Sequence, residues 1–314
     1  MNEPKLYLRP NVVMEPLFSR WYAWLYLLAP GTAPLYVANQ HIKIMQSFVA
    51  QPQLHVAAMK NPELIGGPYI NHGADKVPEI KRLIEATTRE NARLIEFAAA
   101  LRALDAALNE HPRGMSLEEL YPKVPEILRG YVELCYDLRH QPSMRFVEAM
   151  LYRSPFYRDD AQSLLCWRMD RDERSFIFST PRLEDEGCID LRLPFAHPAV
   201  RELSELRYRP APLGHYRELF GAPPEKEPLL RSFLTEEAPP PPSRYEGEGV
   251  RIRYLGHATV LIEARGVSIL TDPSLSYRYP TDLPRYTQDD LPPKIDYVLI
   301  THGHADHLML ETLL

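Results

Sequence analysis

The sequence predicts an α+β protein, because the spacing of apolar residues changes from a helical to a strand period along the chain. Through residue 220, apolar residues recur mostly three and four positions apart, as on the buried face of a helix. From residue 250, short apolar or alternating runs are separated by turn residues, a pattern typical of β-strands. We therefore expect an α-rich N-terminal domain with a small β element at 1–220, a proline-rich linker at 221–249 and a second domain at 250–314.

The clearest helical pattern of the N-terminal part lies between Glu79 and Leu108. Apolar residues there occupy one face, and Pro78 stands at a first-turn position that tolerates proline. SFIFST at 175–180 and CIDLRL at 188–193 flank a turn-like LEDEG and predict a small β-hairpin. Shorter helices are expected over three further segments, His41–Met59, Pro125–Arg139 and Ala199–Leu206.

The proline-rich linker is followed by a strand pattern. Consecutive prolines at 239–242 cannot continue a helix and favour an extended backbone. Alternation in VRIRYL suggests a strand with one solvated face, whereas the denser VSIL and YVLI suggest strands covered on both faces. Ala264–Gly266 is expected to form a tight turn. The expected strands are VRIRYL at 250–255, ATVLIEA at 258–264, VSILTD at 267–272 and IDYVLIT at 295–301.

Composition and charge exclude several classes of function. The chain is 45% hydrophobic and 25% charged, with a formal net charge of −6 and no basic stripe, so we expect a folded protein without a nucleic-acid partner. Cys135, Cys166 and Cys188 are far apart and form no CxxC, which favours reduced thiols in a cytoplasmic protein. The N-terminus shows no apolar signal region, and Trp21–Pro30 is too short to span a bilayer, so we expect a buried core segment and no membrane partner.

One short motif carries metal chemistry. His302, His304, Asp306 and His307 form the pattern HxHxDH directly after the apolar strand that ends at Ile300. Imidazole and carboxylate together suit zinc, iron or manganese. Alternation places His302 and His304 on one side of an extended loop, where both can reach one metal, and Asp306 and His307 can reach a second. The alternative is a histidine-rich surface turn that binds nothing.

Two residues before the motif are weaker candidates. Asp272 ends the strand SILTDP, and His257 lies in YLGHATV. Either side chain could hydrogen-bond a metal-bound imidazole and fix its tautomer. For Asp272, the alternative is a turn acceptor ahead of Pro273. The histidines before the linker are scattered, and no Glu-x-x-His pair, GxSxG or phosphate-binding loop accompanies them.

The motif HGHADH, with LGHATVLIEARGVSILTDP ahead of it, resembles the metallo-β-lactamase superfamily over Val250–Leu314. The resemblance implies an αββα sandwich with a metal site at one edge. It implies His302 and His304 on one metal, and Asp306 and His307 on a second. The family supplies its remaining ligands from further along the chain, so we expect this sequence to be cut inside its catalytic domain and inactive alone.

The N-terminal part adds a second resemblance. LYLRPNVVMEPLFSRWYAWLYLLAP at Leu6–Pro30 and KNPELIGGPYI at Lys60–Ile70 are similar to the N-terminal domain of the chloramphenicol-pathway β-hydroxylase family. That resemblance implies two irons that activate O2 and hydroxylate the β-carbon of an aminoacyl group. The group would be a thioester on a carrier domain of a peptide synthetase. It also implies a homodimer formed through the N-terminal domain, in natural-product biosynthesis.

Two other functions stay open at this stage. One is a dizinc hydrolase of the lactonase or phosphodiesterase type, because the superfamily fold alone does not choose between iron and zinc. The other is a non-catalytic dimerising fragment. If the sandwich is incomplete, apolar faces of the strands Val250–Ala264 and Val267–Thr271 should be exposed.

Overall fold

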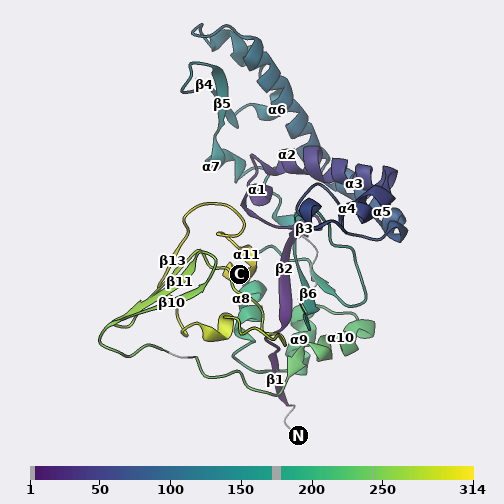
Figure 1. The fold of residues 1–314 in the computed structure, drawn as a ribbon. Helices are drawn as coiled ribbons and strands as arrows, with labels where there is room; N and C mark the ends of the chain where they lie inside the picture. The colour runs from purple at the N-terminus through teal and green to yellow at the C-terminus, as the bar shows by residue number, and fades with distance from the viewer. Residues whose placement is uncertain (1–3, 172–177, 243) are drawn as a thin grey trace. The chain divides into compact units, whose positions relative to one another are not determined.

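The computed structural model describes residues 4–171, 178–242 and 244–314, which divide into two compact units (Figure 1). Within these ranges the first unit holds residues 4–25, 159–171 and 182–314, and the second holds 26–158 and 178–181. Most of the second unit is therefore inserted, in sequence, between two strands of the first. No helix in the described ranges combines the length and the apolar composition that a membrane crossing requires.

The second unit is mainly helical, as the apolar spacing predicts. Its core contains Phe97 and Phe156, whose ring centroids lie 4.4 Å apart. Its one described sheet is a two-stranded hairpin of β4 and β5. The elements, with α1 beginning at the junction of the units, are α1 Leu25–Leu28, α2 Ala33–Tyr36, the π-helix Val37–His41, α3 Ile42–Ala50, α4 Pro52–Ala58, α5 Val77–Glu90, α6 Ala92–Glu110, β4 Val132–Tyr136, β5 Pro142–Phe146, α7 Glu148–Leu151 and the 3₁₀ turns Pro62–Leu64, Ala74–Lys76, Glu118–Lys123 and Glu126–Leu128.

The predicted helix Glu79–Leu108 is two helices, α5 and α6, which meet at Asn91. The Asn91 side chain is buried, and its Nδ2 donates to the Thr87 carbonyl at 3.1 Å. An asparagine side chain that competes for backbone partners favours such a break, and here φ is −108° and ψ is 24°. The predicted helix His41–Met59 also divides, at Gln51, because Pro52 disfavours a helical backbone in the residue before it.

The prediction of a helix over Pro125–Arg139 is wrong. A 3₁₀ turn is followed by β4, which pairs antiparallel with β5 in the register Val132↔Phe146. The turn chemistry decides this outcome, since Asp137 Oδ1 accepts from the backbone N–H groups of Arg139 and Gln141, both at 2.8 Å.

The first unit contains a four-stranded antiparallel sheet in the order β3–β2–β6–β7. Trp21 and Tyr22 form β3 and are buried, which confirms in part the buried segment predicted at Trp21–Pro30, where Tyr26 is 39% exposed. The predicted hairpin of 175–180 with 188–193 lies partly outside the described residues, at 175–177; residues 178–180 form no strand, and β7 pairs with β6. The strands are β2 Val12–Phe18, β3 Trp21–Tyr22, β6 Gln162–Arg168, which follows the 3₁₀ turn Asp159–Ala161, and β7 Ile189–Leu191.

A smaller sheet, in the order β8–β1–β9, and three helices complete the N-terminal part of this unit. The predicted helix Ala199–Leu206 is confirmed as α8. The predicted linker 221–249 is wrong for 224–235, where α10 and β9 place Leu230 and Phe233 in the core. Residues 221–223 and the described residues of 236–249 lack helix and strand. The elements are β1 Lys5–Leu8, α8 Pro198–Glu205, β8 Ala211–Pro212, α9 Leu213–Phe220, the 3₁₀ turn Pro224–Lys226, α10 Glu227–Ser232 and β9 Leu234–Thr235.

The expected strands after the linker form one sheet in the order β10–β11–β12–β13 (Figure 1). The first three strands are antiparallel, and β13 pairs parallel with β12 in the register Leu270↔Val298. Arg265 and Gly266 have φ of 48° and 77°, which confirms the tight turn that joins β11 to β12. The elements are β10 Val250–Gly256, β11 Thr259–Ala264, β12 Val267–Thr271, the 3₁₀ turn Gln288–Asp290, β13 Tyr297–Leu299 and α11 Leu310–Leu313. Both units together confirm the α+β class.

Burial in this sheet differs from strand to strand. Val250, Ile252 and Tyr254 of β10 are each more than 60% exposed, which confirms the expected open apolar face. Leu261 of β11 and Leu270 of β12 are buried instead, in a cluster with Leu255. The expectation that YVLI is covered on both faces is wrong, since every residue of β13 is exposed in this structure.

A buried ion pair lies on the main sheet of the first unit. Glu15 of β2 is 1% exposed, and Arg182 donates to both of its carboxylate oxygens, from Nε and Nη2, each at 2.7 Å. A bidentate pair of this kind satisfies a carboxylate that water no longer reaches. Arg20 donates to the Arg182 carbonyl at 2.8 Å and so joins the turn after β2 to the same site.

We expect Arg182→Met to lower the free energy of unfolding by about 3–5 kcal/mol, because it leaves the Glu15 carboxylate buried without its partner. Urea unfolding followed by circular dichroism measures the loss. Arg192→Met is the matched control, since the Arg192 side chain is 76% exposed and its ion pairs are worth less than about 1 kcal/mol. Equal losses in the two variants would contradict this account of the pair.

Candidate metal centre

The site begins where two parallel strands end at the same edge of the sheet. Asp272 follows β12, and Thr301 follows β13 shortly after Leu299. The Asp272 backbone N–H donates to the Leu299 carbonyl at 2.9 Å. In return, the Asp272 carboxylate accepts from the Thr301 backbone N–H at 2.8 Å and from Thr301 Oγ1 at 2.9 Å. These bonds fix the point from which the HxHxDH loop leaves the sheet.

Asp272 is 1% exposed and lies at the base of the site. Burial alone would raise the pKa of its carboxyl group, but the hydrogen bonds from Thr301 and His307 outweigh burial and lower the pKa below its ordinary value. The carboxylate therefore stays charged and acts as an acceptor. Its Oδ2 lies 3.2 Å from His307 Nδ1, which favours a proton on Nδ1 and leaves Nε2 as an electron-pair donor.

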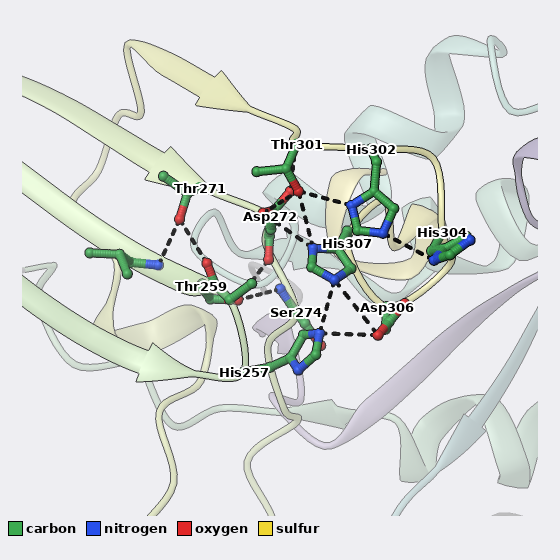
Figure 2. Close-up of polar contacts among 12 residues, drawn as sticks. His257, Thr259, Thr271, Asp272, Ser274, Thr301, His302, His304, Asp306 and His307 are labelled. Atoms are coloured by element: carbon green, nitrogen blue, oxygen red, sulfur yellow. Dashed lines mark hydrogen bonds and ion pairs between the residues drawn. The ribbon is translucent and has the colours of Figure 1, made fainter.

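The loop brings all four predicted residues to one place (Figure 2). His302 Nε2 lies 3.0 Å from His304 Nδ1, and the ring centroids of His302 and His307 are 4.0 Å apart. Asp306 Oδ2 lies 3.8 Å from His307 Nε2. A backbone turn folds the loop and brings these side chains together, because the N–H groups of His307 and Leu308 both donate to the His304 carbonyl.

His257 reaches the same place from the turn between β10 and β11. Its φ is 49°, after Gly256 at 116°, and this left-handed turn directs the ring toward the loop, as Figure 2 shows. His257 Nε2 lies 3.1 Å from Asp306 Oδ2 and 3.3 Å from His307 Nε2. Ligand atoms of His257, Asp306 and His307 fall within 4.8 Å of one another, a spacing that could hold a metal ion.

Threonines fix the frame of the site, and sequence reasoning missed them. Thr301 Oγ1 lies 3.0 Å from His302 Nδ1 and 3.3 Å from His307 Nδ1, in addition to its bond to Asp272. Thr259 Oγ1 donates to the Asp272 carbonyl at 2.7 Å and accepts from the Ser274 N–H at 2.9 Å. The available signal was the position of each threonine at a strand end, next to a candidate residue.

The donor set fits a metal centre of the expected kind. Four imidazole rings and one carboxylate converge, with nitrogen atoms 3.0–3.3 Å apart in two pairs. Nitrogen and oxygen donors in this mixture suit iron or zinc. His257, His302, His304 and Asp306 are exposed within the described residues, whereas Asp272 is buried. The division of these residues between metals stays a prediction.

Two known protein domains match this chain, one in each part. Residues 251–314 match the β-lactamase superfamily domain, and a metal-dependent hydrolase of Bacillus cereus is 44% identical over 59 residues, 19% of this chain and 24% of that protein. Residues 7–239 match the diiron non-heme β-hydroxylase N-terminal domain. Because that match covers most of the chain, the chain belongs to the diiron non-heme β-hydroxylase family, and membership implies two iron ions.

Two further likenesses extend over nearly the whole chain. The 4-amino-L-phenylalanyl-peptidyl-carrier-protein 3-hydroxylase of Streptomyces venezuelae is 34% identical over 322 residues, which cover 98% of this chain and 59% of that protein. The crystal structure of CmlA, a diiron β-hydroxylase from Streptomyces venezuelae, superposes with a TM-score of 0.85 at 31% identity, over 99% of this chain and 59% of that one. This chain thus spans 59% of the length of both.

We expect Asp272→Asn to weaken metal binding by about 10-fold, because a residue that orients a metal-bound imidazole typically contributes that much or more. Competition with a chelator, measured on the complete protein with zinc or iron, gives the affinity. Asp296→Asn is the control, since Asp296 accepts from the Ser268 N–H and pairs with Lys294 outside the site. A loss in the control as large as that in Asp272→Asn would contradict the orienting role.

Proposed function

We propose that the complete protein is an O2-dependent diiron monooxygenase that hydroxylates the β-carbon of an amino acid in natural-product biosynthesis. The amino acid would be carried as a thioester on a carrier domain of a peptide synthetase. The observation that carries this proposal is the joint presence of the β-hydroxylase N-terminal domain at 7–239 and a convergent histidine and carboxylate cluster after β13. The relative from Streptomyces venezuelae supports the substrate class, since it is a hydroxylase of a carrier-bound aminoacyl group.

In this proposal, His302 and His304 would hold one iron, and Asp306 and His307 the other. When bound, the irons would supply the activation of O2, the co-substrate. The chain's own residues do the positioning: Asp272 and Thr301 fix the His307 ring, and Thr301 also lies against His302. His257, with Nε2 at 3.1 Å from Asp306 Oδ2, can hold a proton for that carboxylate or serve as a further donor.

We further propose the partners and location that follow from this function. The carrier domain is the macromolecular partner, and the N-terminal domain forms a homodimer. The protein would act in the cytoplasm, which agrees with three cysteines that form no disulfide. Family matches at 7–239 and 251–314 support a division into an N-terminal domain and a metallo-β-lactamase-like part, with the connection between them at 236–249 rather than 221–249.

A dizinc hydrolase is the second candidate, because the C-terminal part is 44% identical to a metal-dependent hydrolase. That likeness covers 19% of the chain, however, whereas the β-hydroxylase domain covers residues 7–239. A helical N-terminal domain of this family has no role in the hydrolase proposal. The first function therefore accounts for more of the molecule.

We expect the complete protein, expressed without added metal, to contain two irons per chain and little zinc by elemental analysis. With a reductant and an aminoacyl-loaded carrier domain, isotopically labelled O2 should place one labelled oxygen on the aminoacyl group, detected by mass spectrometry. His304→Ala should lose iron and activity together, whereas His215→Ala, remote from the loop in sequence and bonded to Glu202, should lose neither. Two zincs, with hydrolysis of esters or phosphodiesters, would support the second candidate and overturn the first.

A further inference from the structure

A buried carboxylate lies directly after the metal loop, in helix α11. Glu311 is 9% exposed, and Tyr22 of β3 donates its hydroxyl to Glu311 Oε2 at 3.1 Å. Burial and, with it, the nearby Glu311 carboxylate raise the pKa of Tyr277, whose Oη accepts from the Met14 N–H of β2 at 3.2 Å. A carboxylate on α11 is thereby joined to two strands of the N-terminal sheet. We call these residues, Tyr22, Tyr277 and Glu311, the tyrosine–glutamate cluster.

The two chain segments that build the candidate metal centre each contribute one residue to the cluster. The segment that begins at Asp272 continues to Tyr277, and the HxHxDH loop continues through His307 to Glu311. The two segments are also tied to each other, because the Leu275 N–H lies 3.4 Å from Thr312 Oγ1. Each segment is therefore fixed at two points: at the edge of the β12–β13 pair, and again at the N-terminal strands β2 and β3.

The protonation states and burial of the cluster stabilise the contact between α11 and the N-terminal sheet. Burial, together with the charge of Glu311, raises the pKa of both Tyr22 and Tyr277 well above the ordinary value, so both hydroxyls keep their protons as donors. A buried carboxylate that loses a donor is costly, because water cannot replace the bond. The buried Arg207 places its guanidinium carbon 5.4 Å from the centroid of the Tyr277 ring, which adds a positive charge beside the cluster. Its Nη2 donates to the Val12 carbonyl at 2.8 Å.

We propose that Glu311 is a positioning residue: through Tyr22 and Tyr277 it fixes the HxHxDH loop and the Asp272 segment to the N-terminal sheet. Metal affinity in the C-terminal part then depends on a hydroxyl group that β3 supplies. The rings of His302, His304 and His307 lie against one another, so a fixed loop backbone helps to keep them together. The relevance of the proposal to catalysis rests on the proposed function.

The test compares Glu311→Gln and Tyr22→Phe with wild type in the complete protein. Without metal, hydrogen exchange of the backbone amides at 301–311 should speed up several-fold in Glu311→Gln, while the amides of β10 and β11 should not change. Cobalt affinity, measured by competition, should fall by about 10-fold, and the visible spectrum of the cobalt-loaded site should change. Tyr22→Phe, which removes one donor and preserves the ring, should show smaller changes of the same kind.

Glu202→Gln is the matched control, because Glu202 lies on α8 of the same unit, hydrogen-bonds His215 and is half-exposed. It should leave exchange, affinity and spectrum unchanged. Wild-type loop exchange and wild-type cobalt binding in Glu311→Gln would overturn the proposal. If Glu311→Gln fails to fold, Tyr22→Phe decides the question by the same measurements. Loop exchange is measured without metal or substrate, so failure of the proposed oxygenase activity and failure of this proposal are separate results.

Discussion

The bonds between Asp272 and Thr301 hold together the part of the molecule on which its chemistry depends. They close the carboxyl ends of β12 and β13, which are the only parallel pair among the described strands. Parallel strands require a long connection, and here residues 272–296 leave the edge and return to it. The polar groups of the candidate metal centre, apart from His257 and Thr259, lie on one of the two segments that leave this edge. Without the Asp272 carboxylate, the hydrogen bonds that join the starts of the two segments would be lost.

The site has a rigid base and an open face, and the two have different physical causes. At the base, Asp272, Thr259 and Thr301 hydrogen-bond one another and the backbone, so their positions are over-determined. At the face, the imidazole rings lie in a loop with small residues, Gly303 and Ala305, between them. Imidazole nitrogens held this close can direct their lone pairs at one ion, which favours metal binding.

Local pattern was sufficient where one stretch of chain determines the outcome. Alternating and dense apolar runs predict β10 to β12, and the spacing of His302, His304, Asp306 and His307 predicts their convergence. Distant partners decide the rest. Leu230 and Phe233 in the predicted linker look like any apolar pair until Val12 and Leu203 are placed beside them. His257 is predicted as a neighbour of a metal-bound imidazole, but its particular partner, His307, lies fifty residues away and follows only from the fold. Asn91 and the Asp137 turn show a third case, in which one polar side chain overrides a helical period.

The insertion of the second unit bears on the order in which the molecule folds. Phe18 of β2 pairs with both Trp21 of β3 and Gln162 of β6, so the chain leaves and re-enters the first unit on neighbouring strands. Joining β2 to β6 directly would close a loop of well over a hundred residues, at an entropic cost that grows with loop length. An insert that has already folded on its own local contacts shortens that loop to its two ends. A folded insert of this kind would favour the pairing of β2 with β6 in the N-terminal sheet.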